Sequence, residues 1–243
     1  MRTKVRLAHV SDIHLDTDYH GGEDRIDRRD RCRDRFRTLL DNVIEQRPDA
    51  LLIVGDLFDS NRASDDTIVW AMEALGRLPL PVLMIPGNHD CLEDDGIYRR
   101  HDFNRIANVQ MVMSPQGETL ELPELKISAW GKGMAVHSPD FRPLADMPDI
   151  HDGWWNLAMG HGIFVEDGYH SGRSSPIRAD QIEASGRDYV ALGHHHGLRN
   201  VSRGATVAYY CGAPERLSEH SGTFVTVDLE HGAEPVVSIR RVG

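Results

Sequence analysis

The sequence predicts an α/β fold, because short apolar segments alternate with longer amphipathic segments over the first part of the chain. The apolar segments are continuous, as expected of strands that are buried on both faces of a parallel sheet. Their order of strand, helix, strand, helix, strand implies a parallel sheet up to about residue 90. No stretch has the composition of a linker, so we predict a single domain over residues 1–243.

The first half is assigned from the period of its apolar residues. The predicted strands are Val5–Val10, Ala50–Val54 and Val82–Ile85, and the predicted helices are Asp30–Glu45 and Asp65–Leu78. In the first helix, Cys32, Phe36 and Leu39 recur at helical spacing. Ser64 is the predicted N-cap of the second helix.

The second half contains shorter apolar runs. They predict strands at Val109–Met113, Thr119–Leu122, Lys126–Trp130, Asn156–Met159 and Tyr189–Leu192. Residues 138–150, with three prolines, are expected to form a loop or a covering segment. The last three runs are typical of antiparallel strands. They are Val207–Cys211, Thr223–Leu229 and Val236–Arg240, and Glu230-His231-Gly232 predicts a hairpin between the last two.

Composition excludes several classes of protein. The formal net charge of −11 argues against binding of nucleic acid through bulk positive charge. No apolar run approaches the roughly 20 residues of a membrane helix, and His9, Ser11 and Asp12 interrupt the first run, unlike a secretory signal. The three cysteines are odd in number and far apart, which is typical of a reducing compartment. We therefore expect a cytoplasmic protein that does not enter a membrane.

Polar residues of related chemistry follow five of the predicted strands. They are Asp12-Ile13-His14, Gly55-Asp56-Leu57-Phe58-Asp59, Gly87-Asn88-His89-Asp90, Gly160-His161 and Gly193-His194-His195-His196. Because ligand sites of open α/β sheets lie at the carboxyl ends of strands, we expect these side chains to converge. Carboxylates, imidazoles and a carboxamide supply the oxygen and nitrogen donors that first-row metal ions bind.

The spacing also predicts which side chains point together. Residues two apart share a face of an extended segment, so Asp12 and His14 are expected on one side, as are His194 and His196. Together these residues can hold two cations, with Asp56 between them. Two divalent ions roughly 3.5–4 Å apart suit phosphoester hydrolysis, because they clamp the phosphate and generate a hydroxide nucleophile.

The five blocks, in this order, resemble the signature of the calcineurin-like metallophosphoesterase superfamily. The resemblance implies two packed β-sheets flanked by helices, in a four-layer αββα sandwich. It implies two metal sites. Asp12, His14 and His196 would bind the first metal, Asn88, His161 and His194 the second, and Asp56 would be shared by both. It also implies that His89 is the general acid and that the Asp59 carboxylate orients His89.

Within the superfamily, Ser11–Asp16, Gly55–Asp59 followed by Asn61-Arg62, and Ile85–Asp90 are similar to SbcD-type exonucleases of DNA repair. The resemblance implies a nuclease-like phosphodiesterase, in which a metal-bridging hydroxide attacks phosphorus while His89 protonates the leaving alkoxide. The substrate would be a phosphodiester, with nucleic acids and nucleotides as candidates. An ATPase partner and a homo-oligomer both stay open. Mixed Asp, Asn and His ligands fit manganese, iron or zinc, and we favour manganese.

Two other functions are compatible with the same residues. A phosphomonoesterase or phosphoprotein phosphatase would use the same metals, and Asp59 gives this alternative some support. A non-catalytic interaction module on this fold would be expected to lack a ligand or His89, and the sequence lacks none of them.

Some neighbouring residues have two interpretations. Asp90 either tunes His89 or binds backbone in its own turn, and Asp16 either bonds a ligand or is a solvated loop carboxylate. The alternating charges of Arg25–Arg37 predict ion pairs along a helix in preference to a nucleic-acid site.

Loop residues further from the five motif blocks also have two interpretations. The polar segment Tyr169–Ser175 carries His170 and Arg173, and it either meets a phosphate oxygen or forms a surface loop. His20 and His137 are expected to be ordinary loop residues.

Overall fold

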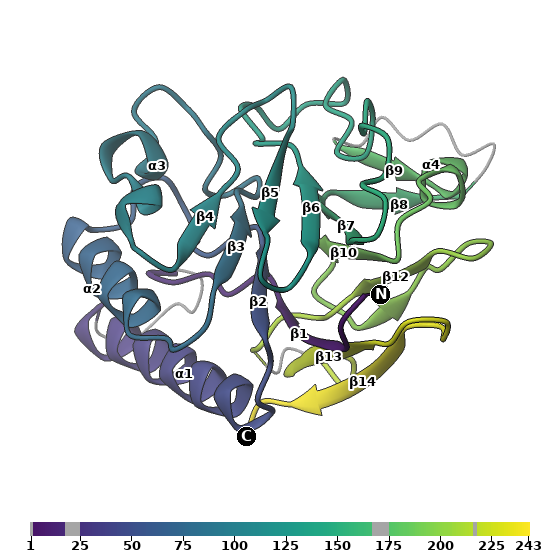
Figure 1. The fold of residues 1–243 in the computed structure, drawn as a ribbon. Coiled ribbons are helices and arrows are strands. Elements are labelled where there is room, and N and C mark those ends of the chain that lie inside the picture. Colours follow the sequence, from purple (N-terminus) through teal and green to yellow (C-terminus); the bar gives the residue numbers. More distant parts are fainter. Residues whose placement is uncertain (1, 18–24, 167–174, 216–217) are drawn as a thin grey trace.

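The computed structural model describes residues 2–17, 25–166, 175–215 and 218–243. Its strands form two six-stranded sheets and one small two-stranded sheet (Figure 1). His20 and nearly all of the segment Tyr169–Ser175 lie outside the described residues, so the two interpretations of that segment stay open.

The first sheet has the strand order β14-β13-β1-β2-β3-β4. Its strands are β1 (Val5–Val10), β2 (Ala50–Val54), β3 (Val82–Ile85), β4 (Val109–Met111), β13 (Thr223–Leu229) and β14 (Val236–Arg241). β1 to β4 are parallel to one another. The C-terminal hairpin of β13 and β14 extends the sheet with antiparallel strands beside β1.

The second sheet has the strand order β11-β12-β10-β7-β6-β5. Its strands are β5 (Glu118–Leu122), β6 (Ile127–Gly131), β7 (Trp155–His161), β10 (Tyr189–Gly193), β11 (Arg199–Asn200) and β12 (Val207–Tyr210). The inner strands β6, β7, β10 and β12 are parallel, and the two edge strands pair antiparallel. β8 (Ile163–Val165) and β9 (Pro176–Arg178) form the small sheet.

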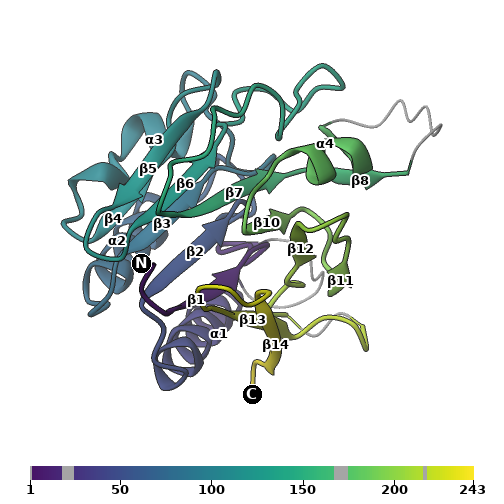
Figure 2. The ribbon, with the colours of Figure 1, turned by 45° about the vertical axis from the view of Figure 1, so that its right-hand side comes forward.

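Helices cover the outer faces of the two large sheets (Figures 1 and 2). They are α1 (Arg25–Glu45), α2 (Asp65–Gly76) and α3 (Ile97–Arg100) on the first sheet, a 3-10 turn at Phe103–Arg105, and α4 (Ala179–Ala184) on the second. Alternate side chains of β2 face opposite layers, as the two-residue period of a strand requires. Leu51 and Ile53 pack under the helices, whereas Leu52 and Val54 pack against the second sheet. The layers therefore follow the predicted order of helix, sheet, sheet and helix.

The three strands predicted for the first half are confirmed, and Ser64 caps α2 by accepting a hydrogen bond from Thr67 N at 3.4 Å. α2 ends at Gly76, two residues before the predicted Leu78. α1 begins at Arg25 and not at Asp30, because the apolar period on which the prediction rested starts only at Cys32. Among the described residues, no helix combines the length and apolar content that a membrane span requires.

Val207–Cys211 was predicted to be an antiparallel strand, and this is wrong for one of its two neighbours. The strand observed here is β12 (Val207–Tyr210). β12 pairs antiparallel with β11 but parallel with β10. The chain leaves β10, forms the edge strand β11 and then returns to run between the two, and this non-local path has no signature in the local sequence. The hairpin of β13 and β14 is confirmed.

Candidate metal centre

The carboxyl ends of strands from both sheets meet at one place. β1, β2 and β3 of the first sheet lead into Asp12, Asp56 and Asn88, and β7 and β10 of the second lead into His161 and His194. Contacts between these side chains cross from one sheet to the other. Neither sheet alone could therefore assemble the site.

Several of these residues have a left-handed backbone. The angle φ is +54° at Asp12, +53° at His14, +52° at Asp56 and +93° at His194. Asp12 and His14 do come together, but the segment is not extended, so the predicted reason for their meeting is wrong. Such a backbone costs a non-glycine residue about 1–3 kcal/mol and is concentrated at ligand sites in proteins.

The residues expected at the first metal lie together. Asp12, His14 and His196 each offer a ligand atom within 4.8 Å of the others. Nε2 of His14 lies 3.2 Å from Nε2 of His196, and Oδ1 of Asp12 lies 3.8 Å from the same His196 nitrogen. Oδ2 of Asp56 lies 3.9 Å from His14 Nε2.

The residues expected at the second metal also lie together. Oδ1 of Asn88 is 3.0 Å from His161 Nε2 and 2.8 Å from His194 Nδ1. Oδ2 of Asp56 is 3.2 Å from His161 Nε2. Asp12, Asp56 and His161 form another group with ligand atoms within 4.8 Å. Both carboxylates, and not Asp56 alone, therefore lie between the two sets.

Backbone N–H groups orient the two carboxylates. His194 N donates to Asp12 Oδ1 at 3.0 Å, and His89 N donates to Asp56 Oδ1 at 2.9 Å. Ser11 Oγ donates to Asp12 Oδ2 at 2.5 Å. A Cβ at Gly87 would overlap the Asp56 carboxylate, so only glycine lets the Asn88 loop approach this closely.

Charge in the cluster is balanced by imidazoles. Asp12 and Asp56 are each 1% exposed, and neither forms an ion pair with Lys or Arg in the described part of the chain. Burial opposes ionisation of Asp56, but the charge of His161 and then that of His14 keep its pKa below the usual range. Burial would lower the pKa of His161, yet the Asp56 carboxylate raises it to about 9. Burial, and then the charge of His161, lower the pKa of His194 to about 4.

This donor set fits divalent cations. Buried carboxylates are unfavourable unless a positive charge compensates them, and imidazole, carboxylate and amide oxygen are common ligands of first-row metals. Nδ1 of His161 lies 2.9 Å from the carbonyl oxygen of Val54. This contact fixes the ring and leaves Nε2 facing Asp56 and Asn88, as in metal sites where the second imidazole nitrogen bonds a backbone carbonyl.

His89 lies at the open side of the cluster. Its side chain is 43% exposed, and its ring centroid lies 4.8 Å from that of His14. Nδ1 of His89 is 2.7 Å from the main-chain oxygen of Asp59 but 4.0 Å from its carboxylate Oδ1, which instead lies 3.0 Å from His14 Nδ1. The carbonyl, and not the predicted carboxylate, therefore holds the His89 ring. His14, Asp56 and His89 also form a group that could hold a metal ion.

Asp90 and Asp16 have structural roles. Asp90 is fully buried, and its carboxylate accepts hydrogen bonds from Gly87 N, Phe58 N and Tyr98 Oη at 2.7, 3.2 and 2.7 Å. The backbone interpretation is therefore confirmed, while Tyr98, which belongs to an ordinary helix pattern, was not predicted. Neither interpretation of Asp16 holds, because its side chain accepts from Arg29 Nε at 2.7 Å and from the backbone N of Ser64 at 2.8 Å.

His137 is not the ordinary loop residue that the sequence led us to expect. Its ring centroid lies 5.8 Å from that of His194, edge to face. Partial burial, and then the charge of His161, lower the pKa of His137. One sequence feature could have predicted this position of His137: it follows β6 by a few residues. The carboxyl end of β6 lies at the same edge of the sheet as those of β7 and β10, which lead into the site.

Four arginines of α1 form ion pairs, but only one pair lies along the helix as predicted, and the other three reach neighbouring segments. The pairs are Arg29 with Asp16, Arg33 with Asp66, Arg35 with Glu215 and Arg37 with Asp34, at N–O distances of 2.7, 2.6, 3.0 and 2.5 Å. These contacts satisfy the guanidinium groups within the protein and give no support to a nucleic-acid site on this helix.

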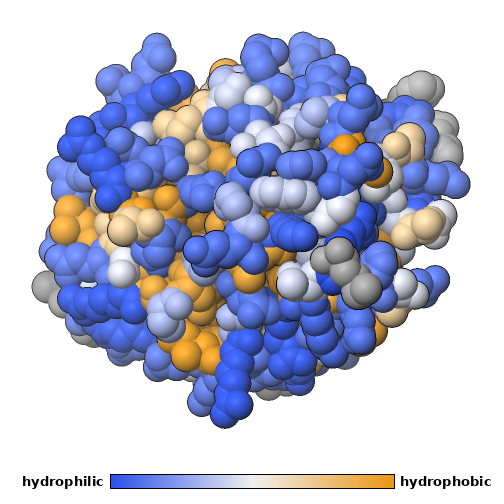
Figure 3. Space-filling view, viewed as in Figure 1, coloured by the Kyte–Doolittle hydropathy of each residue, from blue (hydrophilic) through white to orange (hydrophobic). Residues whose placement is uncertain are grey.

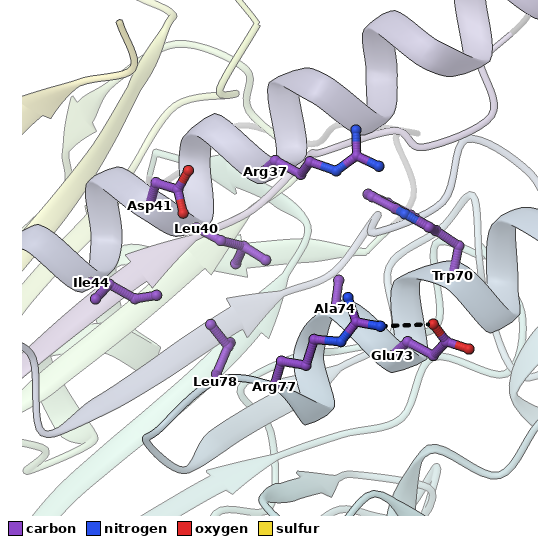
Figure 4. Close-up of a pocket in the computed structure, with 9 residues that line it drawn as sticks. All are labelled: Arg37, Leu40, Asp41, Ile44, Trp70, Glu73, Ala74, Arg77 and Leu78. Atoms are coloured by element: carbon purple, nitrogen blue, oxygen red, sulfur yellow. Dashed lines mark hydrogen bonds and ion pairs between the residues drawn. The ribbon is translucent and has the colours of Figure 1, made fainter.

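A groove lies away from the cluster, between α1 and α2 (Figure 4). Leu40, Ile44 and Leu78 contribute apolar surface, and Arg77 forms an ion pair with Glu73 at 3.2 Å along the α2 side of the groove. From the same side as Figure 1, apolar residues gather around these helices (Figure 3). Its lining contains none of the metal-ligand residues.

The comparisons with known proteins agree with this geometry. Residues 5–198 match the family model of calcineurin-like phosphoesterases. The chain belongs to the calcineurin-like phosphoesterase family. Membership supports a hydrolase that acts on phosphoesters, and the family together with the Asp and His clusters indicates a dinuclear site for divalent metal ions.

Solved structures show the same overall fold at low sequence identity. TT1561 of Thermus thermophilus is 14% identical with a TM-score of 0.63, over 99% of this chain and 100% of that one. The purple acid phosphatase PPD1 from yellow lupin is 11% identical with a TM-score of 0.59, over 100% and 52%. GAP50, the anchor in the inner membrane complex of Plasmodium, is 13% identical with a TM-score of 0.53, over 98% and 85%. These likenesses concern the fold alone.

Proposed function

We propose that this calcineurin-like phosphoesterase is a phosphodiesterase that uses two divalent metal ions. The observation that carries the proposal is the convergence of both predicted ligand sets beside an exposed imidazole, His89. Asp12, Asp56 and their histidine partners would hold the ions.

The charge around the cluster supports a diester over a monoester. A phosphate monoester carries about −1.5 to −2 charges near neutral pH, as phosphorylated side chains do, whereas a diester carries a single charge. Within the described ranges, the ion-pair partners of the Asp12 and Asp56 carboxylates are histidines, and neither carboxylate pairs with Lys or Arg. With imidazoles as the partners of these carboxylates, we favour the singly charged diester.

When bound, two divalent ions supply positive charge for the phosphoryl oxygens and activate water. The chain itself supplies a proton. A contact of 2.7 Å joins His89 Nδ1 to the Asp59 carbonyl oxygen, and since a carbonyl only accepts, Nδ1 carries hydrogen. The proton that the protonated ring can give up is therefore on Nε2. After transfer to a leaving oxygen, the neutral ring keeps the same hydrogen bond and the same orientation.

The finer assignments follow from the donor chemistry. Oxygen and imidazole ligands without cysteine fit manganese, and we favour it over iron and zinc. The open position of His89 and His196, whose side chains are 43% and 42% exposed, supports a substrate as large as a nucleotide or a nucleic-acid end.

The test compares a diester with a monoester on the same metal-loaded protein. Hydrolysis of bis(p-nitrophenyl) phosphate and p-nitrophenyl phosphate is measured with Mn²⁺, Fe²⁺ or Zn²⁺, followed by single-stranded DNA, duplex DNA and cyclic nucleotides. We expect kcat/KM to be higher for the diester, with Mn²⁺ giving the highest rate.

Two controls make the result specific. Asp56→Asn should abolish turnover, because Asp56 contacts both ligand sets. His231→Ala, in the exposed turn between β13 and β14, should leave it unchanged. A higher kcat/KM for the monoester would refute the assignment as a phosphodiesterase. No turnover with any of the three metals would refute the assignment as an enzyme.

A further inference from the structure

The histidines of the cluster form two rows. In the first, His89 lies 4.8 Å from His14 and His14 lies 5.0 Å from His196, measured between ring centroids. In the second, His161 lies 5.3 Å from His194, and His194 lies 5.8 Å from His137. Each row therefore has an exposed ring beside a predicted ligand: His89 in the first row and His137 in the second.

The loop that carries His137 is held in place from two sides. Met134, three residues before it, is 1% exposed, and its carbonyl accepts a hydrogen bond from Leu92 N at 2.7 Å. Leu92 follows the Asn88–Asp90 block. On the other side, the carbonyl of Ser138 accepts from Ser175 N at 3.0 Å. The main chain on both sides of His137 is thus hydrogen-bonded to neighbouring segments, one of which, at Leu92, lies two residues after the Asn88–Asp90 block.

The ring nitrogens of His137 have no assigned partner. Within the described ranges, its side chain forms no hydrogen bond or ion pair, and its ring contact is with His194. Asp56, His161 and His89 lie near enough for their charges to act on it. An exposed imidazole fixed at this distance from the ligands is free to donate a hydrogen bond to an anion held by the cluster.

We propose that His137 contacts the substrate, donating a hydrogen bond to a non-bridging oxygen of the phosphate group on the His194 side of the cluster. The inference rests on the proposed phosphodiesterase function and adds a binding residue to it. His89 acts at the leaving oxygen, whereas His137 holds the phosphate. His137 therefore contributes to affinity for any phosphate that reaches the metals, including inorganic phosphate.

Inorganic phosphate is the probe, because its binding can be measured without turnover. Its Kd is measured by titration calorimetry on the Mn²⁺-loaded full chain, for the wild type, His137→Ala, His137→Asn and His231→Ala. We expect His137→Ala to weaken phosphate binding roughly 10-fold or more, as loss of a hydrogen bond to a charged group does. His137→Asn keeps a donor and should recover part of the affinity, and His231→Ala should match the wild type.

Two further readouts separate contact from structural damage. Bound manganese and Tm should be the same in all four proteins, and the KM for bis(p-nitrophenyl) phosphate should rise more in His137→Ala than its kcat falls. An unchanged phosphate Kd in His137→Ala, a loss of manganese from it, or no phosphate binding by the wild type would each overturn the inference. Failure of the wild type to cleave any diester would remove the proposed function, while the phosphate Kd values would still decide the role of His137.

Discussion

At the scale of single residues, several of the predicted metal ligands share an unusual backbone conformation, which the types of their side chains do not reveal. Asp12, His14, Asp56 and His194 all have positive φ, and each belongs to a predicted metal set. Contacts around the loops offset the cost of this conformation, such as the hydrogen bond from His194 N to Asp12 Oδ1. A sequence names these residues, but their strained geometry depends on neighbours from distant strands.

The role of His89 is the sharpest prediction at this scale. His89→Asn should lower kcat for a phosphodiester by roughly 10²–10⁴-fold, the usual contribution of a general acid. Bound manganese should stay the same, because His89 holds Asp56 through its backbone N–H, which the substitution retains. Steady-state kinetics and metal analysis of the purified variant provide the two measurements.

The same experiment distinguishes an acid from a ligand. His14, Asp56 and His89 could together hold a metal ion. If His89→Asn loses one equivalent of manganese along with its activity, His89 is a metal ligand and the acid is another group. His231→Ala, as before, is the matched histidine control.

At the scale of elements, the loops after β2 and β3 are joined through one buried carboxylate. Asp90 accepts hydrogen bonds from Gly87 N in its own turn and from Phe58 N in the loop after β2. Burial, and then the nearby Asp56, raise the pKa of Asp90. Tyr98 of α3 donates the remaining hydrogen bond, so a short helix supports the two loops that carry Asp56 and Asn88.

Removal of the Tyr98 hydroxyl should therefore lower the stability of the fold more than it lowers phosphodiester turnover. Tyr98→Phe leaves a buried carboxylate with one donor fewer, and we expect a loss of about 1–3 kcal/mol in the free energy of unfolding. Urea denaturation followed by circular dichroism measures it. Tyr209→Phe, which removes a hydroxyl bonded to the exposed Asn200 side chain, is the control and should change little. Equal losses in both variants would contradict the role of Asp90.

At the scale of the whole molecule, the metal ions should link the two sheets. The predicted ligands lie at the ends of β1, β2 and β3 in one sheet and of β7 and β10 in the other, so metal binding should join the two sheets of the sandwich. A ligand that binds only the folded state adds about 2.7 kcal/mol of stability at 100 times its Kd. We expect Mn²⁺ to raise Tm and a chelator to reverse the rise.

Asp56→Asn provides the control for this effect. Because Asp56 contacts both ligand sets, the variant should lose most of the Mn²⁺-dependent rise in Tm in a thermal denaturation series. A full rise in Asp56→Asn would mean that the stabilising ions bind elsewhere on the protein.

A second link between the sheets predicts a dependence of stability on pH. His9 of β1 is fully buried and lies 2.9 Å from Tyr189 Oη of β10 through its Nδ1. Burial lowers its pKa to about 3, against about 6.5 in an unfolded chain. Between these two pH values, His9 is protonated in the unfolded chain but neutral in the folded protein, so acid favours unfolding. The contribution of neutral, buried His9 to the free energy of unfolding is therefore complete above pH 6.5 and is lost as the pH falls toward 3.

Replacement of His9 should flatten that acid dependence. For the wild type, this single group changes the free energy of unfolding by at most about 1.4 kcal/mol per pH unit. His9→Leu combined with Tyr189→Phe removes both partners and should reduce the slope between roughly pH 6 and pH 4, measured by urea denaturation at each pH. His231→Ala should keep the wild-type slope, and an equal slope in the double variant would exclude His9 as its source.

The amino-acid sequence by itself determined the family, the succession of strands and helices along the first half, and the types of residue at the candidate metal centre. These properties are local, because apolar period, glycine turns and motif order can be read along the chain. Only the tertiary structure decided that Asp12 lies between both ligand sets, that the Asp59 carbonyl holds His89, that β12 runs parallel to β10, and that His137 borders the site. Each of these depends on contacts between segments far apart in sequence, within one sheet or between the two, and the period of apolar residues along the chain does not specify such contacts.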